Sequence, residues 1–496
     1  MSYRYISAAE AANYIKNGMS IALSGFTPAG YPKAVCPEIA KIAIEEHKCG
    51  KPYKINLFTG ASTGDSVDGV LSRADAINYR APYTTNKDFR HAVNEGRIHY
   101  KDLHLSEMAQ ELRFGFWGKV DIAIIEACCI TDDGKIYLTT GGGIAPTIAR
   151  MSKGIIIELN HFQSEKLIGM HDVYELQNPI LHNEIPIYNL NDRIGKTYVE
   201  VDPKKIIGIV ETNIPDEARL FRQSDPVTDQ IGRNIAEFLA ADMKKGIIPS
   251  TFLPIQSGVG NIGNAVMSAM GSSKVIPPFN MFSEVIQDSV IKLMREGRIK
   301  FCSTSALTLT TKCLQGVYDD MDFFRDKFVL RESEVSNSAE LIKRFGVISI
   351  NTALEADIYG NINSTHVMGT MMMNGIGGSG DFTHNAYIAI FATPSTAKDG
   401  LISSIVPMSP HIDHTEHSVD VIVTENGVAD LRGKDPQQRA ELIIENCAHP
   451  SYKGILRDYV KISKHHGHTP HSLSKAFAFH TAFMKEGDMH LADFSN

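Results

Sequence analysis

The chain has 496 residues, of which 43% are hydrophobic and 21% are charged, and its net charge is −8 at pH 7. This composition is typical of globular proteins with more than one core, and it argues against a disordered chain. Lysine and arginine never form a run longer than a pair, and no stretch of about 18 apolar residues occurs. We therefore expect neither nucleic acid nor a membrane as a partner.

The seven cysteines contain no Cys-x-x-Cys pair and are too sparse for a disulfide framework. The first 20 residues lack a basic segment followed by an apolar stretch, so they do not look like a secretion signal. Both observations favour a soluble, cytoplasmic protein.

Short apolar runs rich in Val and Ile alternate along the chain with longer amphipathic stretches. The runs that read as buried strands are 19–26, 54–60, 120–127, 205–212, 345–354 and 419–427, and two helical stretches are 38–47 and 227–246. Such alternation is typical of parallel strands joined by helices. The predicted fold class is α/β.

The two halves of the chain resemble each other. "ALSGFTPAGYPKAV" (22–35) matches "IQSGVGNIGNAV" (255–266), "NLFTGASTGDSV" (56–67) matches "NMFSEVIQDSV" (280–290), and 123–143 matches 349–369. Three matches in one order at a nearly constant offset favour an internal duplication, although glycine-rich strand ends of α/β proteins also resemble one another. We expect two similar open α/β domains, 1–225 and 226–496, divided in a polar stretch that contains proline.

A glycine-rich turn in the second half lies between a strand-like and a helix-like run, at residues 257–264. The layout leaves free backbone N–H groups at a helix N-terminus, where they attract negative charge, and glycine lets a ligand come close. The spacing differs from G-x-G-x-x-G, and no P-loop lysine follows, so the motif alone is weak evidence for a dinucleotide. A tight packing turn is the alternative.

The strand-like run 277–284 ends at Ser283 and Glu284, whereas the first half has Gly60 at the position that matches Glu284. A carboxylate at the C-terminal end of a parallel strand faces the crevice where open α/β sheets bind ligands. One copy of the repeat would then be catalytic. The alternative is that Glu284 caps the following helix from its first turn.

Five segments together carry a resemblance to a known family. They are "SGVGNIGNAV", "MFSEVIQDS", "GVISINTALEADIYGNINST", "GIGGSGDF" and "HIDHTEHSVDVIVTENGVADLRG". The chain resembles the acetyl-CoA hydrolase/transferase family, the class I CoA-transferases that act on short carboxylates, over nearly its whole length. The resemblance implies two CoA-transferase-type α/β domains with a glutamate nucleophile at their interface, coenzyme A as a substrate, and no metal or tightly bound cofactor.

The resemblance also implies roles for individual residues. Glu284 would be the nucleophile, Val259 and Gly378 the oxyanion-hole positions, Asn337 a neighbour of the glutamate, and Glu425 a residue that helps to order the site. The positions that would line the CoA site are Gly258, Val259, Gly260, Asn261, Ile262, Leu354, Gly378 and Phe382. Arg219 would pair with a carboxylate, or it is a solvated linker arginine.

Two other clusters read as structural. His411, His414 and His417 have a spacing that invites zinc, but the resemblance implies a metal-free segment. Asp65 and Asp68 could form a carboxylate pair for acid–base work, yet a polar loop is the favoured interpretation because they lie in the half without the glutamate.

The resemblance therefore implies transfer of CoA between short-chain acyl-CoA and a carboxylate such as acetate, propionate or succinate. It predicts ping-pong kinetics through an acyl-glutamyl anhydride and a glutamyl-CoA thioester. An acyl-CoA hydrolase with the same residues is one alternative, and a non-catalytic α/β module that binds CoA or a sugar phosphate is another. A homodimer is the expected assembly.

Overall fold

The computed structural model describes residues 3–218, 225–463 and 467–494. The chain divides into two compact units, each discontinuous in sequence. Unit 1 comprises Met1–Leu220, Asn280–Arg344 and Asn374–Asp381, and unit 2 comprises Phe221–Phe279, Phe345–Met373 and Phe382–Asn496. The predicted domain boundary near residue 225 stays a prediction.

The main sheet of unit 1 is mostly parallel. Its parallel strands are β4 (His99–Tyr100), β3 (Ile77–Ala81), β2 (Ile55–Phe58), β1 (Ser20–Leu23), β5 (Ile122–Ile130), β7 (Gly154–Asn160) and β9 (Ile206–Thr212), in this spatial order. Two antiparallel strands, β6 (Lys135–Leu138) and β8 (Val199–Glu200), extend from β5. The central strands are buried on both faces, which explains why they read as continuous apolar runs.

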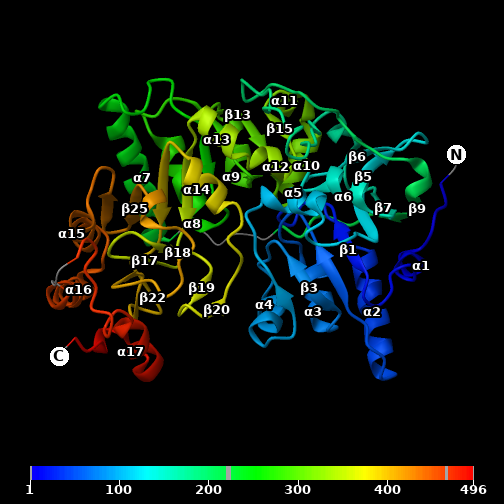
Figure 1. The fold of residues 1–496 in the computed structure, drawn as a ribbon. Helices are drawn as coiled ribbons and strands as arrows, with labels where there is room; N and C mark the ends of the chain where they lie inside the picture. Colours follow the sequence, from blue (N-terminus) through cyan, green and yellow to red (C-terminus); the bar gives the residue numbers. More distant parts are fainter. Residues whose placement is uncertain (1–2, 219–224, 464–466, 495–496) are drawn as a thin grey trace. The chain divides into compact units, whose positions relative to one another are not determined.

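Helices cover this sheet between the strands. They are α1 (Ala8–Ala12), α2 (Val35–Lys48), α3 (Val70–Arg73), α4 (Lys87–Asn94), α5 (Glu107–Phe114) and α6 (Ala145–Met151). Figure 1 shows α2 and α3 beside β1 and β3. Asn86 begins α4 because its side-chain oxygen accepts hydrogen bonds from the backbone N–H groups of Asp88 (2.9 Å) and Phe89 (3.2 Å).

The later segments of unit 1 add further strands and helices. They comprise β11 (Phe279–Phe282), β12 (Val285–Ile286), α9 (Asp288–Arg295), β13 (Ile299–Thr304), β14 (Ala306–Leu307), α10 (Thr311–Asp319), α11 (Met321–Phe324), β15 (Phe328–Leu330), α12 (Ser333–Ser336) and α13 (Ala339–Phe345). Strands β15, β13 and β11 are neighbours in that order, and β12 pairs in parallel with β14. Val285 and Ala306 pack with Phe26, Ala29 and neighbouring residues in one apolar cluster, so these segments share a core with the first 220 residues.

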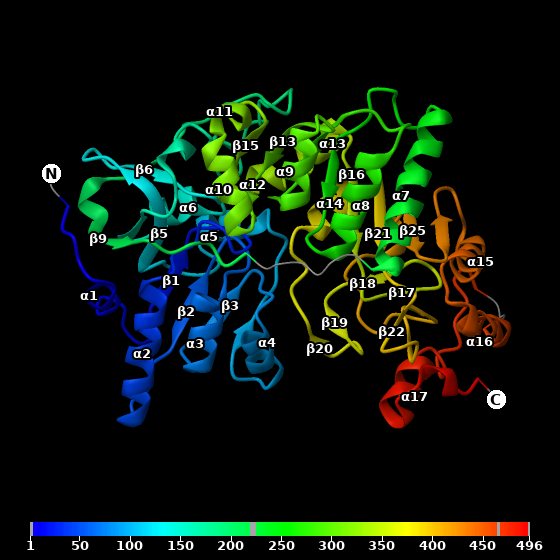
Figure 2. The ribbon, with the colours of Figure 1, turned by 180° about the vertical axis from the view of Figure 1, so that it is seen from behind.

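Unit 2 has its own parallel strands. They are β10 (Ile255–Ser257), β16 (Ile348–Thr352), β21 (Ile388–Ala392) and β25 (Val421–Thr424), followed by the antiparallel β26 (Gly427–Asp430). Its helices are α7 (Pro226–Lys244), α8 (Asn261–Ser272), α15 (Pro436–Asn446), α16 (Pro450–Ile462) and α17 (Ala478–Glu486), and α14 (Ser379–Asn385) begins in unit 1. Helices α7 and α8 pack side by side (Figure 2).

Short strands complete unit 2. β17 (Glu355–Asp357) lies between β18 (Ile362–Asn363) and β24 (Ile405–Val406). Two small antiparallel pairs are β19 (His366–Val367) with β20 (Met371–Met372), and β22 (Thr396–Ala397) with β23 (Ile402–Ser403). In the described part of the chain, no helix combines the length and apolar character needed to cross a membrane.

The strand orders show the repeat that the sequence predicts. The series β4, β3, β2 corresponds to β15, β13, β11, and the series β1, β5, β7, β9 corresponds to β10, β16, β21, β25. In both copies the glycine-rich turn follows the strand that comes first in sequence, β1 or β10. The α/β fold class is confirmed.

Candidate active site

Glu284 lies two residues beyond the end of β11, between that strand and β12. Its backbone carbonyl accepts hydrogen bonds from the N–H groups of Ser305 (3.0 Å) and Ala306 (3.1 Å), which fix the main chain at this point. Helix α9 begins only at Asp288, with Gln287 as its N-cap residue, so Glu284 does not lie in the first turn of that helix. The Glu284 side chain, which is half-buried, therefore does not cap α9.

Asn337 is a polar partner of the Glu284 carboxyl. It is fully buried at the C-terminal end of α12, and its Nδ2 donates to Glu284 Oε1 at 2.9 Å and to Asp381 Oδ2 at 3.0 Å. Its Oδ1 accepts from the Ser336 hydroxyl at 3.0 Å. One amide nitrogen therefore joins two carboxyl groups.

Asp381, in the first turn of α14, is the second acid of this group. Its carboxyl accepts from the Ser106 hydroxyl at 2.6 Å and from the Ser106 backbone N–H at 3.2 Å, and only 7% of the residue is exposed. Neither Asp381 nor Ser106 is singled out by the sequence analysis. The signal that could have found Asp381 is its place directly after the glycine-rich segment 375–380.

Gly378 brings the main chain against the glutamate. A Cβ atom at this position would lie 1.8 Å from Glu284 Oε1 and 2.4 Å from Asn337 Nδ2, so only glycine fits. Two further contacts hold the same loop in place. The Ile376 N–H donates to Asp102 Oδ2 at 2.9 Å, and Gly380 packs against the His104 ring. Glu284, Asn337 and Gly378, which the sequence assigns to one site, do lie together.

The electrostatics of this group favour a proton at neutral pH. Burial raises the pKa of Glu284 to about 7, against the hydrogen bond from Asn337, and the charge of Asp381 adds to the rise. Burial likewise raises the pKa of Asp381 to about 7, although the hydrogen bonds from Ser106 and Asn337 oppose it. The charge of Asp381 thus links the protonation of Glu284 to its neighbour.

Buried ion pairs anchor the segment that leads into Asn337. Arg331 pairs with Asp172, and Arg113 pairs with Glu334 at 2.5 Å. Each pair joins the region around α12 to the first 220 residues. Breaking a buried pair leaves a charge without a partner, so these contacts hold α12, and with it Asn337, in one position.

The glycine-rich turn that contains Val259 belongs to unit 2. The Gly258 N–H donates to the Ile350 carbonyl at 3.0 Å, and Gly260, with φ of 130°, is the N-cap residue of α8. A Cβ at Gly258 would meet nothing closer than 3.7 Å, whereas one at Gly263 would lie 2.3 Å from the Gly258 carbonyl oxygen. Packing thus requires glycine at position 263, whereas a side chain at position 258 would meet no close neighbour. Val259, between Gly258 and Gly260, is 41% exposed.

The other positions named by the resemblance also lie in unit 2. Asn261 and Ile262 begin α8, Phe382 is fully buried in α14, and the Leu354 N–H donates to the Asn363 carbonyl at 2.9 Å. Glu425 follows β25 and accepts from the backbone N–H of Ser395 at 2.9 Å and from its hydroxyl. Arg219 lies outside the described residues. The predicted catalytic and CoA-binding roles of these residues stay predictions.

The two clusters that read as structural have local partners. Asp65 pairs with Arg73 at 2.8 Å, and the buried Asp68 pairs with Arg80 at 2.9 Å. His411 contacts Asp413 at 3.2 Å, whereas the His414 ring packs on Phe391 with centroids 4.9 Å apart. Within residues 3–218, 225–463 and 467–494, no group of three or more His, Cys, Asp or Glu side chains is arranged to hold a metal ion.

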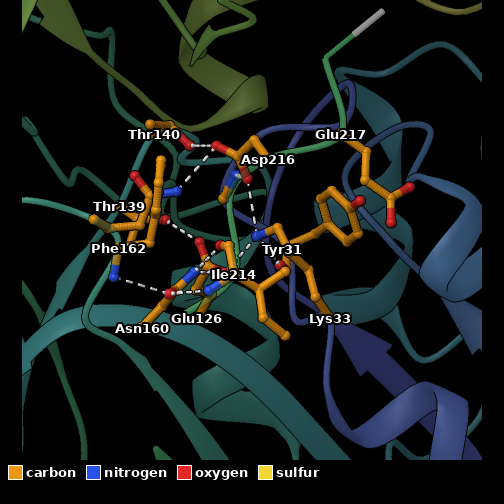
Figure 3. Close-up of polar contacts among 12 residues, drawn as sticks. Tyr31, Lys33, Glu126, Thr139, Thr140, Asn160, Phe162, Ile214, Asp216 and Glu217 are labelled. Atoms are coloured by element: carbon orange, nitrogen blue, oxygen red, sulfur yellow. Dashed lines mark hydrogen bonds and ion pairs between the residues drawn. The ribbon is translucent and has the colours of Figure 1, made fainter. Parts of the chain in front are cut away.

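Glu126 on β5 and Asp216 in the segment after β9 form another pair of acids in unit 1, and both are buried (Figure 3). Lys33 contacts Glu126 at 2.5 Å, Asp216 at 2.8 Å and the Tyr31 carbonyl at 2.8 Å, so all three donors of its ammonium group are used. Burial alone would lower the pKa of Lys33, but the charges of Asp216 and Glu126 raise it above its usual value. The sequence analysis does not single out this cluster.

Hydroxyl and amide groups surround these two acids. Thr139 donates to Glu126 at 2.7 Å and Asn160 donates to it at 3.0 Å, while Thr140 donates to Asp216 at 2.5 Å. Asn160 also donates to the Ile214 carbonyl at 2.7 Å (Figure 3). The cluster thus connects β5, β7 and the segment after β9, which indicates a structural role.

Two models of one protein family match the chain. The acetyl-CoA hydrolase/transferase N-terminal domain matches residues 2–211, and the C-terminal domain of the same name matches residues 314–460. The chain belongs to the acetyl-CoA hydrolase/transferase family, and the predicted family resemblance is confirmed.

Individual relatives match over nearly their full length. A propanoyl-CoA:succinate CoA transferase of Escherichia coli is 49% identical, over 98% of both chains. A succinyl-CoA:acetate CoA-transferase of Clostridium kluyveri is 48% identical, over 98% of this chain and 90% of the relative. An acetyl-CoA hydrolase of Schizosaccharomyces pombe is 37% identical, over 96% of this chain and 94% of the relative.

Solved structures share the fold. RipA from Yersinia pestis superposes with a TM-score of 0.71 at 20% identity, over 92% of this chain and 97% of the other. A 4-hydroxybutyrate CoA-transferase from Porphyromonas gingivalis gives a TM-score of 0.63 at 21% identity, over the same shares of the two chains. At these identities the likeness concerns the fold alone.

Proposed function

We propose that this enzyme transfers CoA between a short-chain acyl-CoA and a carboxylate, with Glu284 as the nucleophile. The observation that carries the proposal is the Glu284 carboxyl in contact with a buried amide, Asn337, and with the bare main chain of Gly378. The two relatives near 49% identity, named as transferases acting with succinate or acetate, support this class of substrate.

In the first step, an oxygen of the ionised Glu284 carboxylate attacks the thioester carbonyl of the acyl-CoA. The C–O bond of an acyl-glutamyl anhydride forms, the C–S bond breaks, and CoA leaves as a thiolate. A carboxylate is a weak nucleophile, so the tetrahedral oxyanion needs fixed donors, and loss of one such donor typically costs about 3–4 kcal/mol. The backbone N–H group of Gly378 is a proposed donor.

In the second step, the thiolate attacks the carbonyl carbon of Glu284. A glutamyl-CoA thioester forms, and the original acyl group leaves as a carboxylate with the electron pair of the broken C–O bond. The incoming carboxylate then reverses both steps and departs as the new acyl-CoA. Covalent catalysis of this kind divides one difficult exchange into easier steps and gives ping-pong kinetics.

Hydrolysis is the second candidate, because relatives at 37% identity are named acetyl-CoA hydrolases. Water in place of the second carboxylate would cleave the same glutamyl thioester. The residues described here serve both reactions, so the difference depends on how well water is excluded.

An acceptor experiment separates the two reactions. The purified enzyme is incubated with succinyl-CoA, with and without acetate, while free thiol and acetyl-CoA are measured. Transfer predicts acetyl-CoA formation with acetate present and little free thiol without it. Rapid release of CoA in the absence of acetate would contradict the transferase proposal, and Glu284→Gln serves as the inactive control.

A further inference from the structure

The side-chain amide of Asn337 has two N–H groups, and each of the two nearby carboxyl groups accepts a hydrogen bond from this nitrogen. Nδ2 lies 2.9 Å from Glu284 Oε1 and 3.0 Å from Asp381 Oδ2. We propose that Asp381 is a positioning residue, which holds the Asn337 nitrogen toward Glu284 Oε1, the oxygen that stays a carbonyl in the anhydride, throughout the reaction. This inference rests on the proposed function of Glu284.

The side-chain amide of an asparagine can rotate so that its oxygen and nitrogen exchange places, because the two ends have similar size. The partner of the other end does not prevent this, since the Ser336 hydroxyl, 3.0 Å from Asn337 Oδ1, can donate or accept. An ionised carboxylate only accepts, so Asp381 selects the orientation with nitrogen inward.

The contribution of Asp381 becomes largest after Glu284 has reacted. In the anhydride, Glu284 no longer carries a negative charge, and its remaining oxygen is a carbonyl with weaker attraction for an N–H group. That oxygen becomes the oxyanion when the CoA thiolate attacks. The ionised form of Asp381 still accepts from the Asn337 nitrogen at this stage and keeps it in place to receive the new charge.

Asp381 is itself held firmly enough for this role. Ser106 gives it two hydrogen bonds, from the hydroxyl at 2.6 Å and from the backbone N–H at 3.2 Å. The charged or titratable side chains around it are Glu284, Glu107 on the neighbouring α5, and His104, whose ring packs against Gly380. The Asp381 charge also raises the pKa of Glu284.

Two substitutions separate the hydrogen bond from the charge. Asp381→Asn can still accept from Asn337 and Ser106 through its amide oxygen, whereas Asp381→Leu removes the acceptor. We expect Asp381→Leu to lower kcat about 100-fold with little change in KM, because a misplaced oxyanion donor affects the transition state. Asp381→Asn should keep kcat within about tenfold and move the acid limb of the pH profile to lower pH, since a like charge is removed.

The matched control is Glu107→Gln, which removes a charge from α5 without touching Asn337, and it should leave kcat within about twofold. In an Asn337→Ala background, Asp381→Leu should cause little further loss, because the two residues act as one unit. Equal losses in Asp381→Asn and Asp381→Leu, or full additivity with Asn337→Ala, would overturn the inference. A wild-type enzyme that forms no adduct on Glu284 would instead overturn the proposed function.

Discussion

Two pairs of acids in unit 1 have opposite surroundings. Glu126 and Asp216 share an ammonium donor, Lys33, whose hydrogen-bonding capacity is fully used. Glu284 and Asp381 share only a neutral amide donor, Asn337, and bare main chain lies against the Glu284 oxygen. We expect the first pair to stabilise the fold, and we propose that the second keeps a carboxyl available for chemistry at a cost in stability.

The largest effect should come from Glu284→Gln. If Glu284 is the nucleophile, activity should fall by about three or more orders of magnitude, because no covalent intermediate can form. The folded structure should persist, since an amide preserves the size of the side chain. Steady-state transfer rates and a thermal unfolding curve test this, and residual activity within tenfold of wild type would refute the assignment.

Lys33→Met should chiefly affect stability. It leaves Glu126 and Asp216 buried without their cation, so the free energy of unfolding should fall by about 3–5 kcal/mol. Lys41→Met is the matched control, because Lys41 pairs with Glu38 on the surface and its side chain is 68% exposed. That substitution should change the free energy of unfolding by less than about 1 kcal/mol. Denaturant titration compares the two, and equal effects would show that the buried cluster is not a special anchor.

Gly378→Ala should impair catalysis more than folding. The added methyl group would overlap Glu284 Oε1, so the carboxyl must move, and misplacement by about 1 Å can cost about 100-fold in rate. Gly316→Ala, in the middle of α10, is the control because its Cβ would meet nothing within 4 Å. The control should be slightly stabilised, by about 0.5–1 kcal/mol, with unchanged activity. Unchanged kcat in Gly378→Ala would mean that the loop does not touch the working glutamate.

The pH dependence should be the mildest effect. With a pKa of about 7, Glu284 is protonated and inactive in acid, so kcat/KM should fall below about pH 7. Because the pKa of Glu284 is raised on folding, the folded state binds this proton more tightly than the unfolded chain does. This contribution to stability is lost as the pH increases through about 7. Glu284→Gln should therefore melt at a higher temperature than wild type at pH 8. An acid limb near pH 4 would contradict the buried environment.

Much of the fold follows from the sequence pattern. The predicted strand 19–26 contains β1, 120–127 contains most of β5, and 419–427 contains β25. The helix predicted over 227–246 is α7 at Pro226–Lys244. These elements are predictable because both faces of each central strand are buried, and because α7 has a capping box at Asp225 and proline at its first position.

The site is only partly predictable. Glu284 can be found because the repeat places Gly60 opposite it, and Gly378 because glycines are so dense around it. Ser106 and the Lys33 cluster depend on contacts between residues far apart in sequence, such as Ser106 with Asp381, and nothing in a local pattern reports these. Their local sequences read equally well as a helix start or a strand end.

The central claim is that Glu284 becomes covalently bound to acyl and then to CoA. The most direct test is to hold the enzyme with acyl-CoA, reduce it with borohydride, and determine the mass of the peptide that contains residues 279–290. The account predicts a glutamyl thioester reduced to an alcohol at position 284, absent in Glu284→Gln. An unmodified peptide during active turnover would contradict it.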